Sequence, residues 1–76
     1  MGEMQLQDAP RTAIQLNGER FETPARTLAE LVAGQGFAAA AVATAVNGDF
    51  VPREARAATL LADGDKVEIV APRQGG

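Results

Sequence analysis

The stretch TAIQLNGERFE, residues 12–22, decides how the chain begins to fold. Polar and apolar residues alternate on both sides of Asn17-Gly18, as they do in half-buried strands. Asn-Gly between two such runs is the strongest short-range signal for a β-hairpin, because both central residues of a type I′ turn need positive φ. The sequence therefore predicts an opening hairpin in which Ile14 and Leu16 share one face.

A helix is predicted directly after this hairpin. Pro24 stops the second strand, and Thr27 with Glu30 matches a capping box, in which each side chain satisfies a free backbone N–H at the helix start. Three apolar residues then follow at helical spacing, so they form one stripe on a helix over 28–35. These are Leu28, Leu31 and Val32.

The end of that helix can be placed in two ways. The alanine run 38–41 has high helix propensity and could extend it. Gly34 and Gly36 favour a break, with Gly36 as the left-handed residue after the helix and Phe37 packing back on the last turn.

The second half of the chain repeats the hairpin pattern. Residues 42–46 read as a strand, and Asn47-Gly48 turns it toward Phe50 and Val51. Pro52 confines that next strand to a sheet edge or ends it.

The final third is predicted as a connection followed by one strand. Residues 53–61 form the connection, with a turn of helix around 54–57, and Asp63-Gly64-Asp65 forms a turn. Residues 66–70 form the last strand, and its alternation buries Val67 and Ile69.

The predicted order is two strands, a helix, two strands and a last strand. One helix covering one face of a mixed sheet is the economical arrangement, and the last strand fits best beside the first, in parallel. The fold class is therefore α+β, a ubiquitin-like β-grasp with a mixed four- to five-stranded sheet packed on one main helix. We expect a flexible leader over 1–11, the β-grasp domain over 12–71 and a flexible reactive tail over 72–76.

Composition excludes several classes of function. The net charge is −3, and there are three phenylalanines but no Tyr or Trp, which disfavours a nucleic-acid binder. No apolar run reaches the length of a membrane span and no signal peptide is visible, so we expect a cytoplasmic protein. Cys, His and Ser are absent, so the chain lacks the commonest nucleophiles, general bases and metal ligands.

The remaining ionisable groups have structural explanations. We expect Lys66, the only lysine, to form a surface ion pair with Asp65. Asp63 and Asp65 fit turn chemistry better than a metal site, and no phosphate-binding loop is present. The sequence thus predicts neither a metal site nor a bound cofactor, and an autonomous enzyme is not expected.

The last residues offer the one reactive group that the composition leaves. A terminal carboxylate is an anion at neutral pH, able to attack an electrophile such as the α-phosphate of ATP. Gly75-Gly76 has no side chains, so its backbone can enter a narrow channel. Pro72 keeps this segment out of the sheet, and Arg73 offers five donors to a partner.

Four stretches together resemble the ThiS family of sulfur carriers in thiamine biosynthesis, which are ubiquitin-like β-grasp proteins. The resemblance covers about 12–76. The stretches are IQLNGERFE (14–22), TLAELV (27–32), AVNGDFVPRE (45–54) and LADGDKVEIVAPRQGG (61–76).

The resemblance implies a function for Gly76. An ATP-dependent adenylating enzyme would convert its carboxylate to an acyl-adenylate, and sulfur from a cysteine desulfurase would displace AMP to leave a thiocarboxylate. Thiazole synthase would then take the sulfur to build the thiazole ring. ATP would be used by the partner, and the carrier would bind no cofactor.

The partner-binding residues expected are the tail and its surroundings. Arg73, Gln74 and Gly75 would be gripped beside Gly76, against the exposed sheet face. Arg53 also matches the family pattern and is a candidate contact. The alternative is that its side chain serves only to keep a loop solvated. Asn47 matches as well, but its turn explains it.

Three other functions remain open from the sequence. The chain could be the small subunit of molybdopterin synthase, which has the same kind of terminus, although the stretch around VNG-FVPRE favours the thiamine carrier. It could be a modifier attached to protein lysines. It could also be an interaction domain with an inert tail.

Overall fold

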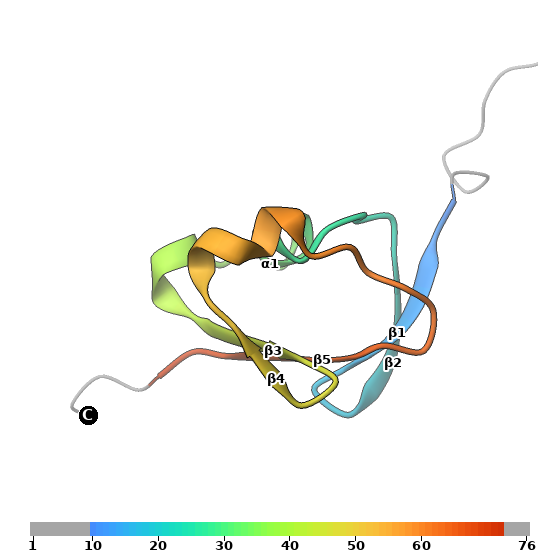
Figure 1. The fold of residues 1–76 in the computed structure, drawn as a ribbon. Coiled ribbons are helices and arrows are strands. Elements are labelled where there is room, and N and C mark those ends of the chain that lie inside the picture. The colour runs from blue at the N-terminus through green and yellow to red at the C-terminus, as the bar shows by residue number, and fades with distance from the viewer. Residues whose placement is uncertain (1–9, 73–76) are drawn as a thin grey trace, which may run out of the picture.

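This computed structural model describes residues 10–72. They form a five-stranded mixed sheet with its helices on one face (Figure 1). The strands are β1 (Thr12–Leu16), β2 (Glu19–Thr23), β3 (Ala43–Val46), β4 (Asp49–Val51) and β5 (Lys66–Val70). The helices are α1 (Leu28–Gly34) and two 3₁₀ helices, η2 (Ala39–Ala41) and η3 (Arg53–Ala58). Apart from Pro10, Arg11 and Pro72, the predicted leader (1–11) and tail (72–76) lie outside the described residues.

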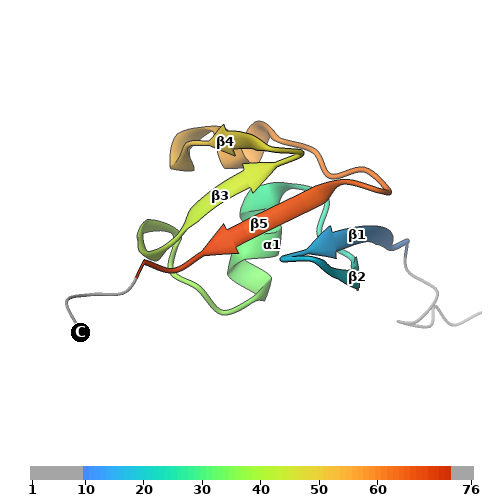
Figure 2. The same ribbon diagram turned by 90° about the horizontal axis from the view of Figure 1, so that it is seen from below.

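The strand order β2-β1-β5-β3-β4 places the last strand at the centre of the sheet (Figure 2). β5 runs parallel to β1 and antiparallel to β3, while each hairpin adds an antiparallel edge. This is the predicted insertion of the last strand beside the first. The β-grasp fold is confirmed.

Both Asn-Gly pairs form the turns that the sequence predicts. Asn17 and Asn47 have φ of 51° and 53°, and Gly18 and Gly48 both have φ of 87°. Two consecutive positive φ values are the signature of a type I′ turn, whose twist matches that of the flanking strands. Each turn fixes the register of its hairpin. In the first hairpin, Ile14 pairs with Phe21.

The start of α1 carries a modified capping box. The Thr27 hydroxyl accepts the N–H of Glu30 at 3.1 Å, as predicted. The Glu30 carboxylate reaches back one residue further than in the standard box and accepts the N–H of Arg26 at 2.7 Å. A helix of seven residues is too short to be stable alone, so this cap and the packing below it hold the helix.

The glycines end α1, and the alanine run does not extend it. Gly36 has φ of 86°, its N–H donates to the Ala33 carbonyl, and the N–H of Phe37 donates to the Val32 carbonyl. These two bonds form a Schellman motif. The alanines, after this reversal, form only the 3₁₀ turn η2, because their backbone has been redirected toward β3.

The core lies between α1 and the covered face of the sheet. The predicted helical stripe and the inward residues of the strands are buried, and Leu16 and Phe21 pack at the margin. The buried apolar residues are Ile14, Leu28, Leu31, Val32, Val42, Val67 and Ile69. The opposite face of the sheet has no layer over it in the described part of the chain (Figure 1).

The connection after β4 is more ordered than the sequence suggested. The sequence predicts a turn of helix around 54–57, and the structure shows the 3₁₀ helix η3 over six residues, packed against α1. No helix within residues 10–72 has the length and hydropathy needed to cross a bilayer.

Candidate functional site

The chain leaves the sheet from the end of its central strand. β5 ends at Val70, opposite Ala43, the first residue of β3. Ala71 and Pro72 follow and are exposed. Figure 2 shows β5 ending at the side of the sheet where β3 begins. The residues after Val70 therefore depart from an open side of the domain.

The end of β5 is set by the hydrogen bonds on its two sides. Toward β1, the last main-chain bond runs from the N–H of Asn17 to the Val67 carbonyl at 2.9 Å, and the side chain of Asn17 takes the next position of the ladder. Its amide oxygen accepts the N–H of Ile69 at 2.9 Å, and its amide nitrogen donates to the Ile69 carbonyl at 3.2 Å. Toward β3, pairing stops at Val70. Pro72 has no N–H with which to continue.

Exposed apolar side chains lie beside this exit on the uncovered face of the sheet. Val70 is 56% exposed and Phe50 is 68% exposed. Val70 is paired with Ala43, and Phe50 is paired with Ala45 two residues along the same strand. We call Phe50, Val70, Ala43 and Ala45 the apolar face; the exposed Glu68, which pairs with Ala45, adds a carboxylate beside it.

Arg53 lies at the same side of the sheet as the exit. It begins η3 directly after Pro52, and it is exposed. Because Thr44 pairs with both Val51 and Ile69, the end of β4 lies two strand spacings, about 10 Å, from the end of β5. The structure thus places the predicted contact Arg53 on the side of the sheet from which the chain leaves β5.

Arg56 was not predicted as a site residue, and it is buried on the same 3₁₀ helix as Arg53. Its side chain is 3% exposed, and its guanidinium donates to the Thr44 hydroxyl at 3.0 Å and to two main-chain carbonyls. These carbonyls belong to Ala39 at 2.8 Å and Val42 at 2.7 Å. The signal available was the spacing of two arginines three residues apart, which puts them on one face of a 3₁₀ helix.

The turn residues have structural roles. Asn47 accepts the N–H of Lys66 and donates to an oxygen of Asp65, whose other oxygen accepts the N–H of Ala62. Asp63 accepts the N–H of Ala13 at 2.9 Å. The turn interpretations of Asn47, Asp63 and Asp65 are confirmed.

The predicted ion pair between Lys66 and Asp65 is wrong. Both oxygens of the Asp65 carboxylate are occupied by hydrogen bonds from Asn47 and Ala62, so the carboxylate faces its own turn. Within residues 10–72 the one ion pair joins Arg20 and Glu22 at 2.8 Å, on the edge strand β2.

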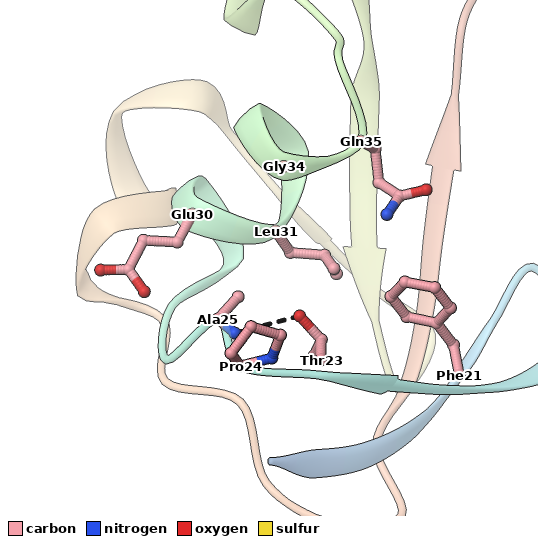
Figure 3. A pocket seen from close by; sticks show the side chains of 8 residues that line it. All are labelled: Phe21, Thr23, Pro24, Ala25, Glu30, Leu31, Gly34 and Gln35. Carbon is pink, nitrogen blue, oxygen red and sulfur yellow. Dashed lines mark hydrogen bonds between the residues drawn. The ribbon is translucent and has the colours of Figure 1, made fainter. Parts of the chain in front are cut away.

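A groove lies between β2 and α1 (Figure 3). It has a volume of about 400 Å³, and its lining includes Phe21, Pro24, Leu31 and Gln35. Thr23 within it accepts the N–H of Ala25 at 3.0 Å. β2 and β4 are at opposite edges of the sheet, so this groove lies away from Arg53.

The predicted reactive residue Gly76 and its neighbours Arg73, Gln74 and Gly75 lie outside the described residues. In the described part of the chain, no three His, Cys, Asp or Glu residues come together as a metal site would require. The structure therefore brings the exit of the tail, the apolar face and Arg53 to one side of the sheet.

Comparison with known proteins assigns the family. The model of the ThiS family matches residues 8–76, which is nearly the whole chain. The chain belongs to the ThiS family. It is therefore a sulfur carrier of that family, as the four stretches quoted above suggested.

A solved structure agrees with this family assignment. The crystal structure of the thiamine biosynthesis protein ThiS from Geobacter metallireducens matches with a TM-score of 0.70 and 32% sequence identity. The match covers 86% of this chain and 100% of that one. A search of curated proteins finds no significant match.

Proposed function

We propose that this ThiS-family protein carries sulfur for thiazole formation in thiamine biosynthesis, as a thiocarboxylate on Gly76. The observation that carries the proposal is the end of β5 at Val70, on an open side of a domain that belongs to the sulfur-carrier family. Six residues, 71–76, follow the strand. Fully extended they span about 20 Å, enough to reach from the surface of the carrier into a deep active site.

The proposed chemistry begins with activation of the carboxylate. One oxygen of the Gly76 carboxylate attacks the α-phosphate of ATP in an adenylating partner, and pyrophosphate leaves. This forms a mixed anhydride with AMP. The carrier needs no side-chain catalyst for this step, because the partner supplies the nucleotide, the metal-bound phosphates and the exclusion of water.

Sulfur then replaces AMP on the same carbon. A persulfide derived from a cysteine desulfurase attacks the acyl-adenylate, AMP leaves with the bonding electron pair, and a thiol reduces the resulting acyl disulfide to the thiocarboxylate. Thiazole synthase consumes that sulfur. The absence of Cys from the chain fits this scheme, since no thiol of the carrier competes for the persulfide.

The partners are proposed to bind the side of the domain around the exit. Phe50 and Val70 are more than half exposed there, and exposed apolar side chains close together commonly mark protein contacts. Arg73, Gln74 and Gly75 would lie in the partner's channel, with Arg53 at its rim. ATP would be bound by the partner.

Intact-mass analysis tests the proposal. The carrier is incubated with ATP, a ThiS-family adenylating enzyme, a cysteine desulfurase, cysteine and a thiol reductant. We expect the C-terminal peptide to gain the mass difference between sulfur and oxygen, and the gain to vanish without ATP. An unchanged terminal peptide in the presence of all components would refute the proposal.

Genetic rescue tests the pathway separately from the chemistry. Expression of the carrier should restore growth without thiamine to cells that lack their own thiamine sulfur carrier. It should leave cells that lack the molybdopterin synthase small subunit without molybdoenzyme activity. The opposite result would keep the thiocarboxylate and reassign the pathway.

A further inference from the structure

Two arginines meet at a shallow cavity beside the ends of β4 and β5. The cavity has a volume of about 250 Å³, and its lining includes Phe50, Ala40, Ala43, Arg53 and Arg56. Ala43 pairs with Val70, so the cavity adjoins the exit of the tail. We call this the arginine corner.

The charge of Arg56 is not balanced by a carboxylate. Its three hydrogen bonds go to neutral acceptors, one hydroxyl and two carbonyls, and no acidic group lies within 4.0 Å of it in the described part of the chain. A guanidinium has five N–H groups, so two of them donate no hydrogen bond to any residue in 10–72. A fixed positive charge with two free N–H donors therefore lines the cavity. The low dielectric constant of the protein interior strengthens the electric field of this charge.

Arg53 adds a second charge at the rim. It lies one turn before Arg56 on η3, so both side chains face the same side of the 3₁₀ helix. Its neighbour Glu54 is the nearest acid in sequence, but neither arginine forms an ion pair with it. The corner thus holds two positive charges in a chain whose net charge is −3.

We propose that the arginine corner binds a carboxylate side chain, Asp or Glu, of a partner protein. A guanidinium fork matches a carboxylate with two parallel hydrogen bonds. The apolar wall at Phe50 suits the methylene stem of such a side chain, and a cavity of about 250 Å³ is smaller than the sites that enclose drug-sized ligands. That this partner is the adenylating enzyme rests on the function proposed above.

A titration that needs no partner tests the site. The full chain, labelled with ¹⁵N, is titrated with glutarate, inorganic phosphate or NaCl at matched ionic strength, and the arginine Nε–H and backbone N–H signals are followed by NMR. We expect saturable shifts with glutarate at Arg53, Arg56 and Ala43. Arg53→Gln should weaken the glutarate response at least about tenfold, while Arg20→Gln, on the opposite edge, should leave it unchanged.

Several results would overturn the inference. Shifts that follow ionic strength alike for glutarate and NaCl would mean that no site exists. Tighter binding of phosphate than of glutarate would reassign the corner to a phosphate ligand. A glutarate response retained in Arg53→Gln would place the binding elsewhere.

A kinetic arm separates the site from the function proposed above. In adenylation assays, Arg53→Glu should raise the KM for the carrier at least about tenfold with kcat nearly unchanged, whereas Arg20→Glu should not. If glutarate binds but adenylation does not occur even with the wild-type carrier, the proposed function fails and the site stands. If adenylation proceeds and Arg53→Glu leaves KM unchanged, this partner does not use the corner.

Discussion

Asn17 has two roles, because it is the first central residue of a type I′ turn and its side chain also completes the ladder of β5. Its backbone has φ of 51°, and its amide forms two hydrogen bonds with Ile69, 52 residues away. The side chain therefore stands in for a main-chain partner at the point where the tail departs. Hairpin formation and the end of the last strand are linked through one residue.

Asn17→Ala is expected to lower the free energy of unfolding by about 3 kcal/mol, the sum of about 1 kcal/mol for each hydrogen bond and about 1 kcal/mol for a left-handed alanine. Asn17→Gly is the matched control, since glycine accepts this φ and loses only the two bonds. It should cost about 2 kcal/mol. Urea denaturation measures both values. If Asn17→Gly is as stable as the wild type, the side-chain bridge contributes nothing.

Arg56 ties η3 to three acceptors earlier in the chain: Ala39 in η2, Val42 just before β3, and Thr44 within β3. Arg56→Met keeps the aliphatic volume but leaves the carbonyls of Ala39 and Val42 without their donors. A buried carbonyl left without a donor costs more free energy than a hydrogen bond to it contributes. We therefore expect the free energy of unfolding to fall by about 3 kcal/mol.

The control for Arg56 is Arg20→Met on the exposed edge strand, which should change stability by less than about 0.5 kcal/mol because surface ion pairs contribute little. Thermal and urea unfolding of both variants make the comparison. Equal losses of stability in the two variants would show that the buried guanidinium stabilises the fold no more than an exposed one.

Residues were predictable from the sequence where a local rule governs them. The positive φ of Asn17 and Asn47 follows from the turn type alone. The bond from Asn17 to Ile69 and the burial of Arg56 depend on segments far apart in the chain, so no local pattern encodes them. For the same reason the ion pair expected from the adjacency of Lys66 and Asp65 did not form, since Asn47 and Ala62 take the carboxylate.

Among the elements, α1 is the one whose existence depends most on its ends. Seven residues form few internal hydrogen bonds, and two side chains, Thr27 and Glu30, satisfy free N–H groups at its start. The sequence predicted the start and the glycine stop correctly, because both are set by residues within one turn of the boundary. It left the alanine run open, since propensity alone does not reveal where the chain must turn toward β3.

Thr27→Ala is expected to cost about 1 kcal/mol in the free energy of unfolding, because it removes the acceptor for the Glu30 N–H. Thr27→Ser keeps that acceptor and should cost less than about 0.5 kcal/mol. Hydrogen exchange should show faster loss of protection in the first turn of α1 for the alanine variant. Equal protection in the two variants would mean that packing alone holds this end.

At the scale of the whole molecule, folding and function are assigned to different parts of the chain. Ile69 is the last buried residue of the described core, and β5 ends one residue later at Val70, with its last ladder bonds to Asn17 and to β3. The proposed reactive carbon lies six residues beyond that closure. The fold could be predicted from repeated local signals, whereas the site needed the family resemblance, because a terminal carboxylate is present in every protein.

This separation predicts a double dissociation between two variants. Deleting Gly76 leaves a chain that still ends in glycine, but it withdraws the carboxylate by about 3.5 Å, the length of one extended residue. Misplacement of a reacting group by about 1 Å can cost a hundredfold in rate, so sulfur loading should fall at least about a hundredfold. The free energy of unfolding should change by less than about 0.5 kcal/mol, because the core closes before the tail begins.

Ile69→Ala is the complementary variant. It removes a side chain that is 5% exposed, so it should lower the free energy of unfolding by about 3 kcal/mol. Its tail is intact, so below its unfolding midpoint it should still be loaded at close to the wild-type rate. Calorimetry and intact-mass kinetics on the same samples measure both quantities. Sulfur loading that follows stability in both variants, and not the position of the terminal carboxylate, would contradict the assignment of function to the tail.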